Sequence, residues 1–139
     1  MTTTTAVIDR LRSRIGAEGP PVTAVVEAGH VRRFAEAIGD SNPRWTREAP
    51  PTFLVALAPV SLHLAEAEEY GHGWLNGGNR FESIEPVKVG DRITATGKVV
   101  DVYEKTGSSG SLLFIIFETE YVNQHGRPVA RLRGTAIRR

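Results

Sequence analysis

The chain contains no cysteine, which excludes disulfide bonds, thiolate nucleophiles and cysteine-based zinc sites. Aromatic residues make up only 7%, and methionine occurs once. The longest strongly apolar run, "LLFIIF", is far too short to cross a bilayer. The first residues, "MTTTTAVIDR", lack the basic start, long apolar stretch and cleavage site of a secretion signal and suggest a frayed terminus. These absences predict a cytoplasmic protein that does not enter a membrane.

The charges nearly cancel, because 17 Lys and Arg residues face 16 Asp and Glu residues. A formal net charge of +1 gives no electrostatic reason to expect a nucleic-acid or membrane partner. The basic end "RLRGTAIRR" alternates charged with apolar residues, which is typical of a solvated strand face. With 139 residues, 40% of them hydrophobic, the chain is long enough to form one domain with its own core.

The first half of the chain is predicted to be mainly helical. Val7, Ile8, Leu11 and Ile15 recur at helical spacing, and Gly16 provides a stop signal. Pro59 should bend or break the longest apolar segment. The elements expected after Gly16 are a strand at 20–29, an amphipathic helix at 30–40, a loop at 41–51 and a buried helix at 52–71 capped by Thr52.

The second half has the pattern of an antiparallel sheet. Turn sequences such as "TGSSG" and "QHGRP" separate runs rich in β-branched and aromatic residues. The strands expected are 78–87, 92–105, 111–123 and 128–139. A single buried helix against a sheet of about five strands is an α+β architecture.

Five stretches, in order, match one known family: "FAEAIGDSNP", "APPTF", "GGNRFE", "VKVGDRITATGKVVDVYEK" and "LLFIIFETEYVNQHGRPVAR". On these residues the chain resembles the MaoC-like (R)-specific enoyl hydratases and dehydratases, and above all their N-terminal half, the FAS1-like dehydratase domain. The resemblance implies a hotdog fold, in which a curved antiparallel sheet wraps a central helix. The hotdog domain is expected at residues 16–139, preceded by an N-terminal extension with a short helix at 1–15.

The same resemblance implies a lyase of fatty acid metabolism that acts on acyl-CoA or acyl-carrier-protein thioesters, without metal or cofactor. Catalytic halves of the family carry Gly-Asp-x-Asn-Pro-x-His, whose Asp and His hold the water that adds to the enoyl double bond. The matching positions are Gly39, Asp40, Asn42 and Pro43. Trp45 stands at the histidine position, and an indole has no basic nitrogen. Asp40 and Asn42 are the candidate catalytic residues, although both are also ordinary turn residues.

A second departure concerns the start of the central helix. Catalytic halves begin it with Ala-His-Gly, and the glycine N–H binds the thioester oxygen, a contribution of roughly 3–4 kcal/mol in comparable oxyanion holes. Here Pro51 falls at the glycine position and has no N–H. Only "TREAPP" separates Trp45 from Thr52, where catalytic halves carry a longer excursion. Thr52 and Phe53, which open the helix, are candidate substrate-binding residues.

Other polar groups leave alternatives open. Gly77 and Gly78 permit close approach of a ligand or another backbone, and Arg80 can bind a phosphate or a partner chain, so all three are candidate binding residues. His63 and three acids of the central segment are alternative bases, as in hotdog thioesterases that place an acid on this helix. The three acids, which also fit a solvated helix end, are Glu66, Glu68 and Glu69.

The two lost groups favour a non-catalytic half that shapes the acyl tunnel of a hydratase or dehydratase. Its predicted partner is a second hotdog subunit, in a heterodimer or heterotetramer, or a second copy in a homodimer. One alternative is a self-sufficient hydratase or acyl-CoA thioesterase that uses Asp40 or a helix acid. Another is an acyl-CoA-binding module without chemistry.

Overall fold

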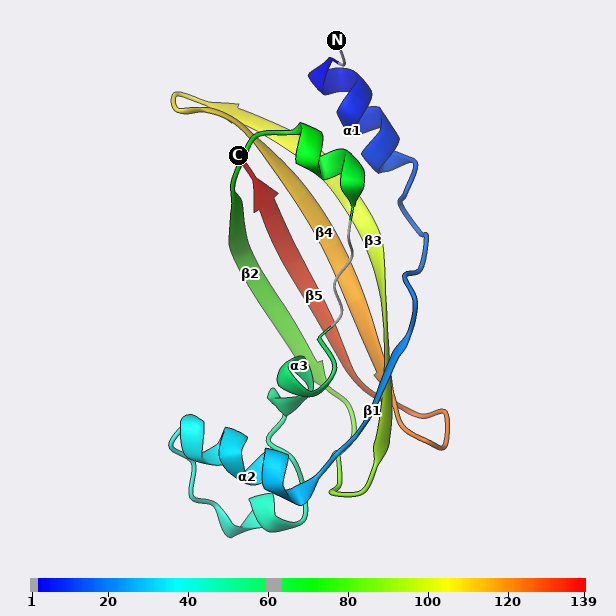
Figure 1. The fold of residues 1–139 in the computed structure, drawn as a ribbon, viewed down its shortest axis with the longest axis vertical. Coiled ribbons are helices and arrows are strands. Elements are labelled where there is room, and N and C mark those ends of the chain that lie inside the picture. The colour runs from blue at the N-terminus through cyan, green and yellow to red at the C-terminus, as the bar shows by residue number, and fades with distance from the viewer. Residues whose placement is uncertain (1–2, 60–63) are drawn as a thin grey trace.

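The computed structural model describes residues 3–59 and 64–139 as one antiparallel sheet with short helices packed on it (Figure 1). The five strands lie in the order β1-β3-β4-β5-β2. The elements are α1 (Thr4–Arg12), β1 (Val22–Val25), α2 (Ala28–Ala37), the 3-10 helix η1 (Pro43–Thr46), α3 (Phe53–Leu57), the 3-10 helix η2 (Ala65–Glu69), β2 (Trp74–Ser83), β3 (Arg92–Gly107), β4 (Gly110–Val122) and β5 (Pro128–Arg138). None of the described helices is long and apolar enough to span a bilayer.

The sheet follows the alternation in the sequence. β3 and β4 form a long hairpin that closes at Gly107 and Gly110, with alternating buried and exposed residues along both strands. A register shift between Val99 and Asp101 interrupts this ladder, and such bulges bend and twist a strand. β2 begins at Trp74, four residues before its predicted start, because its pairing with β5 continues to Arg138. β2 also ends at Ser83, four residues before its predicted end, and the other three predicted strands are confirmed to within two residues.

Within the described residues, the N-terminal segment forms helix α1 from Thr4, although the sequence suggested a frayed terminus. The hydroxyl of Thr3 accepts the N–H of Ala6 and caps the helix. Val7, Ile8 and Leu11 are buried, as their spacing predicts, whereas Ile15 lies beyond the end of the helix and is exposed. Helix α1 therefore starts nearer the N-terminus than the apolar pattern indicated.

The predicted helix at 52–71 is wrong as a single element. Helix α3 has five residues, and the segment from Ala65 folds as the separate 3-10 helix η2. Pro59 follows the end of α3, so the predicted break is present. Thr52 occupies the N-cap position, but its side chain makes no capping hydrogen bond. The predicted loop at 41–51 contains one turn of 3-10 helix, η1.

Two clusters of buried residues lie at opposite ends of the sheet (Figure 1). We call the end that carries α2, η1 and α3 the motif end, and the end that carries α1 and η2 the α1 end. Buried side chains at the motif end include Val31, Phe53, Leu54, Ile93, Tyr121 and Val129. Those at the α1 end include Val7, Leu11, Ala67, Tyr70, Val102 and Leu113.

Candidate functional site

The motif loop, residues 39–46, follows helix α2 and ends in η1. Asp40 Oδ1 accepts the backbone N–H of Asn42 at 3.0 Å. Asn42 Oδ1 in turn accepts the backbone N–H of Arg44 at 3.0 Å and caps η1. These bonds span two residues each and form local turns. Both candidate catalytic residues therefore hold the shape of the loop.

Trp45 lies where the family places its histidine. The indole packs against the buried cluster of the motif end, and the Arg44 guanidinium lies 5.8 Å from its ring centroid. The indole Nε1 is buried and has no hydrogen-bond partner among the described residues. A buried N–H is a donor only, so this side chain cannot exchange a proton with a water near neutral pH.

A groove of about 320 Å³ lies between helix α2 and the motif loop. It brings Asp40, Asn42 and Trp45 together on one wall, while Arg32 and Glu36 of α2 contribute charged groups to the other. The groove does not include Thr52, Phe53, Gly77, Gly78 or Arg80. The candidate residues are thus divided between the motif loop, the start of α3 and the strand β2.

The start of α3 is built from a proline pair. Phe53 donates its N–H to the carbonyl of Pro50 at 2.9 Å, and Pro51 lies between them without an N–H of its own. The Phe53 side chain is fully buried and meets the ring of His30 edge-on at 4.7 Å. Thr52 is exposed. Phe53 is therefore a core residue of this chain, and Thr52 is the accessible one of the two candidates.

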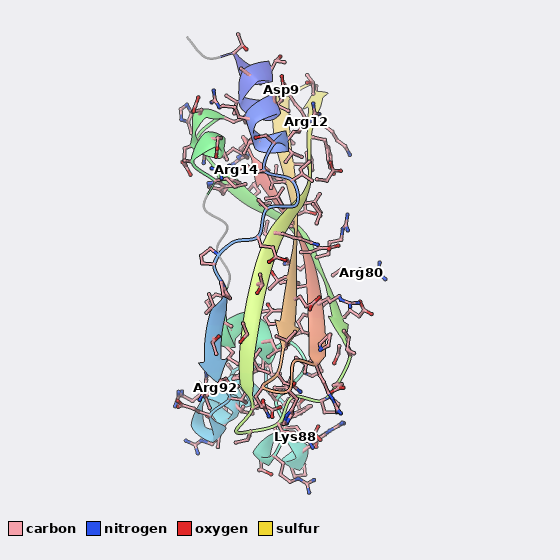
Figure 2. The ribbon with its side chains drawn as sticks, turned by 90° about the vertical axis from the view of Figure 1, so that its right-hand side faces the viewer. Asp9, Arg12, Arg14, Arg80, Lys88 and Arg92 are labelled. Atoms are coloured by element: carbon pink, nitrogen blue, oxygen red, sulfur yellow. The ribbon has the colours of Figure 1, made fainter. Side chains whose placement is uncertain are left out.

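Gly77, Gly78 and Arg80 lie on β2, the edge strand next to β5. The register of β2 shifts between Asn76 and Gly78, and the Asn76 side chain accepts the N–H of Gly78 at 2.9 Å. A Cβ on Gly77 would lie 2.9 Å from the terminal methyl groups of Thr135 and Ile137, which would have to shift, and Gly78 has a φ of +127° that favours glycine. Arg80 is exposed and projects outward from the sheet (Figure 2).

The three acids of the central segment are each bonded to an arginine of a distant element. Arg14 Nη2 lies 2.9 Å from Glu66, Arg10 Nη2 lies 2.7 Å from Glu69, and Arg138 Nη2 lies 3.1 Å from Glu68. We call these six residues the arginine–glutamate cluster. The pKa of Glu66 is lowered, first by a hydrogen bond from its own backbone N–H and then by the nearby Arg14 guanidinium. Burial opposes this shift but is outweighed. A carboxylate held ionised in this way is a weak base. The alternative base His63 lies outside the described residues.

Arg138 was not singled out in the sequence, where it sits in a basic terminal run. Its guanidinium is buried, with 5% of the residue exposed. It donates to the carbonyls of Ala67, Tyr70 and Gly71 and lies 5.0 Å from the ring centroid of Trp74. A guanidinium that satisfies several carbonyls at once fixes the backbone that presents them. One sequence signal could have indicated its burial. Alternate residues of a strand share a face, and Ala130, Leu132 and Gly134, which share the face of Arg138 on β5, are also buried.

Solved structures show which fold this arrangement belongs to. The chain superposes on the ChsH1–ChsH2 complex of Mycobacterium tuberculosis with a TM-score of 0.81 at 15% identity, over 96% of this chain and 89% of that chain. It also superposes on a C-terminally truncated HadBC (3R-hydroxyacyl-ACP dehydratase) complex of the same organism with a TM-score of 0.65 at 19% identity, over 89% and 98% of the two chains. The five-stranded curved sheet with its short helices is a hotdog fold, as predicted.

Sequence comparison then defines the family. The profile of the FAS1-like dehydratase domain region matches residues 13–132, so the chain belongs to this family. It is also 30% identical over 115 residues to the UPF0336 protein SCO4636 of Streptomyces coelicolor, covering 70% of this chain and 76% of the relative. The resemblance to MaoC-like dehydratases is therefore confirmed. Helix α1 lies outside the matched residues.

Proposed function

We propose that this chain is the non-catalytic half of an (R)-specific enoyl-thioester hydratase or 3-hydroxyacyl-thioester dehydratase. It would supply sheet surface and part of the acyl tunnel, while a second hotdog subunit supplies the proton-transfer residues. The thioester would be carried on CoA or on an acyl-carrier protein. Two of the structural neighbours are described as complexes of two differently named chains, which agrees with such a division of labour.

The observation that carries the proposal is the state of the motif loop. Addition of water to an enoyl thioester needs one group that takes a proton from water and a route that delivers a proton to the α-carbon. Position 45 holds an indole whose Nε1 is buried, and Oδ1 of Asp40 is already bonded to the loop backbone. Pro51 contributes no N–H at the start of α3, where an oxyanion donor is needed. Two groups that the reaction uses, a titrating ring at position 45 and an N–H at position 51, are therefore missing from this chain, and Asp40 has a structural role in its loop.

The rival in which this chain hydrolyses thioesters needs a free acid on the central segment. Glu66, Glu68 and Glu69 are instead bound by arginines, and the pKa of Glu66 is lowered. These ion pairs join η2 to α1, to the residues just after it and to β5. The observations therefore favour the supporting role over the thioesterase.

The test measures hydration of crotonyl-CoA by the purified chain, alone and mixed with a hotdog chain that carries an intact Gly-Asp-x-Asn-Pro-x-His motif. We expect no turnover from this chain alone and a higher rate in the mixture than from the catalytic chain alone. Asp40→Asn in this chain should leave the rate of the mixture unchanged. The matched substitution of the aspartate in the partner's motif should abolish it.

Three outcomes would contradict the proposal. Robust turnover by this chain alone that Asp40→Asn abolishes would make it a self-sufficient hydratase. Release of free CoA thiol would make it a thioesterase. Tight binding of acyl-CoA by calorimetry, without turnover in any mixture, would make it a binding module.

A further inference from the structure

Two rows of charged side chains cross the outer face of the sheet, which is the face turned away from the buried clusters. The cross-strand partners in the first row are, in order, Glu18, Lys98, Glu118, Arg133 and Arg80. Those in the second row are Glu120, Arg131 and Glu82. Opposite charges alternate along both rows, and such cross-strand pairs stabilise a sheet. The one like-charge pair of the two rows is formed by Arg133 and Arg80.

This pair leaves a positive charge without a partner. Residues directly opposite each other on antiparallel strands have their Cβ atoms about 4.5–5.5 Å apart, and like charges in such a pair are destabilising. Arg133 Nη1 lies 2.7 Å from Glu118, whereas Arg80 forms no ion pair within residues 3–59 and 64–139. The nearest acid on the same strand, Glu82, lies opposite Arg131. The two guanidinium groups therefore retain N–H donors for an anion.

A groove of about 410 Å³ extends from the two arginines across the outer face to β3. Most of the remaining lining comes from Gly78, Asp101, Tyr103, Ile116 and Thr135. Apart from its own chain neighbours, none of the described residues has an atom within 4 Å of the place that a Cβ on Gly78 would take. The groove is therefore open beside the arginine on β2. Its volume lies in the range of small-molecule sites, about 300–1,000 Å³.

The two ends of this groove differ in chemistry. At β2 and β5, the planar guanidinium forks match the oxygens of a phosphate. At β3, the aromatic ring of Tyr103 is held by stacking on Phe114, with the ring centroids 4.9 Å apart. Asp101 also lies on β3, two strands away from Arg133. Its Oδ1 accepts the N–H of Val102, which leaves Oδ2 to accept a donor from a ligand.

We propose that this groove is a binding site for a nucleoside monophosphate. The phosphate lies between Arg80 and Arg133 and supplies the negative charge that the first row lacks. The sugar crosses Ile116, which lies between the two ends of the groove. The base lies beside Tyr103 and directs an amino group to Asp101, whose carboxylate would repel a second phosphate at that end. The inference does not depend on the proposed function, because this groove shares no residue with the groove at the motif loop.

The first test titrates the full chain with adenosine 5′-monophosphate (AMP) in a calorimeter. We expect saturable binding that weakens as the salt concentration rises, because Arg80 and Arg133 are exposed. Inorganic phosphate and adenosine each lack part of the contacts and should bind at least about tenfold more weakly than AMP. Arg80→Gln should also weaken the binding of AMP at least about tenfold. The matched control is Arg92→Gln, which removes an exposed arginine that does not line the groove.

A second variant separates the base from the phosphate. Tyr103→Leu should weaken the binding of AMP and leave the weaker binding of inorganic phosphate unchanged, because the ring contacts only the base. A residue that merely supports the fold would affect both ligands alike.

Thermal unfolding gives an independent readout. Without ligand, Arg80→Gln should raise the midpoint of unfolding, because it relieves the like-charge pair. AMP should raise the midpoint of the parent chain and leave that of the variant nearly unchanged. An arginine that only packs on the sheet would give the opposite sign in the first comparison.

Four results would overturn the proposal. They are an absence of saturable AMP binding by the parent chain, equal affinity of Arg80→Gln and the parent, binding of inorganic phosphate as tight as that of AMP, and binding of CoA without binding of AMP. The last result would assign the two arginines to a thioester carrier. An acid of another chain that pairs with Arg80 in solution would block AMP and produce the first result.

Discussion

At the α1 end of the sheet, glutamates of η2 bond to arginines 52 to 70 residues away in the sequence. At the motif end, the side chains of Asp40 and Asn42 bond to backbone groups only two residues away. The polar groups of the first region connect α1, η2 and β5. The side chains of Asp40 and Asn42 shape a single loop. The arginine–glutamate cluster therefore contributes to tertiary structure, whereas the two motif residues fix local conformation.

This difference bears on which residues can change without loss of the fold. A side chain that satisfies distant carbonyls cannot be replaced without leaving those groups unpaired. A turn residue can be replaced by any residue that offers the same acceptor. The turn of the motif loop therefore needs only the side-chain acceptors at Asp40 and Asn42 to keep its shape. Arg138, which bonds to the carbonyls of Ala67, Tyr70 and Gly71, has no such freedom.

The largest effect is expected at Arg138. Arg138→Ala removes a buried guanidinium that bonds to the carbonyls of Ala67, Tyr70 and Gly71. Hydrogen bonds to a charged group contribute about 1.5–3 kcal/mol each, and several are lost together, so we expect unfolding to become easier by about 3–5 kcal/mol. Urea unfolding followed by circular dichroism measures this change. The control Arg133→Ala removes an exposed ion pair to Glu118 and should cost at most about 1 kcal/mol.

A smaller loss is expected from helix α1. Leu11 is fully buried against the cluster of the α1 end, although the helix lies outside the residues matched by the family. Leu11→Ala should lower the free energy of unfolding by about 2–3 kcal/mol, toward the lower part of the range for buried leucines, because a short terminal helix can shift to fill the space. Ile15→Ala, at a position that is 43% exposed, is the matched control. Equal effects of the two substitutions would mean that α1 is not part of the cooperative unit.

Sequence patterns predict the sheet far better than the central segment. Alternating residues and turn chemistry place β3, β4 and β5 within a few residues, because both signals are local. The apolar stretch from Thr52 predicts one helix, yet the chain forms α3 and then η2. Arg138 bonds to the carbonyls at the end of η2 from the far end of the chain, and no local pattern contains that contact.

The candidate site shows the same limit. The motif letters predict a turn at Asp40 and Asn42, and the structure has it. The motif also indicates that Trp45 cannot act as a base. The burial of the indole N–H, which meets no acceptor among the residues that the structure describes, depends on how η1 packs on the core, and the local sequence does not specify that packing. Properties that follow from the residue type, such as the inability of Trp45 to act as a base, were thus predictable from the sequence. The burial of its N–H was not.

A third, smaller effect tests the α1 end through pH. Tyr70 donates its hydroxyl to Glu104 at 2.7 Å, and burial, with the adjacent carboxylate, raises the pKa of Tyr70 to about 12. Because the folded pKa lies above the unfolded value of 10.0, this stabilisation is fully present below about pH 10 and is lost as the pH rises through 12. Tyr70→Phe should therefore cost about 1 kcal/mol at pH 8 and less at pH 11. Urea unfolding of both proteins at the two pH values measures the difference, and a constant difference would contradict the assignment.

The smallest effect is expected at Asp40. Asp40→Asn keeps a side-chain oxygen where the N–H of Asn42 is accepted, so the free energy of unfolding should change by less than about 0.5 kcal/mol. Asp40→Ala removes that acceptor and should cost about 1 kcal/mol, because the loop N–H then loses its partner. Thermal unfolding of the two variants side by side separates the acceptor from the charge. If Asn is as damaging as Ala, the carboxylate charge matters in itself, and the motif end then has an electrostatic role beyond the shape of its loop.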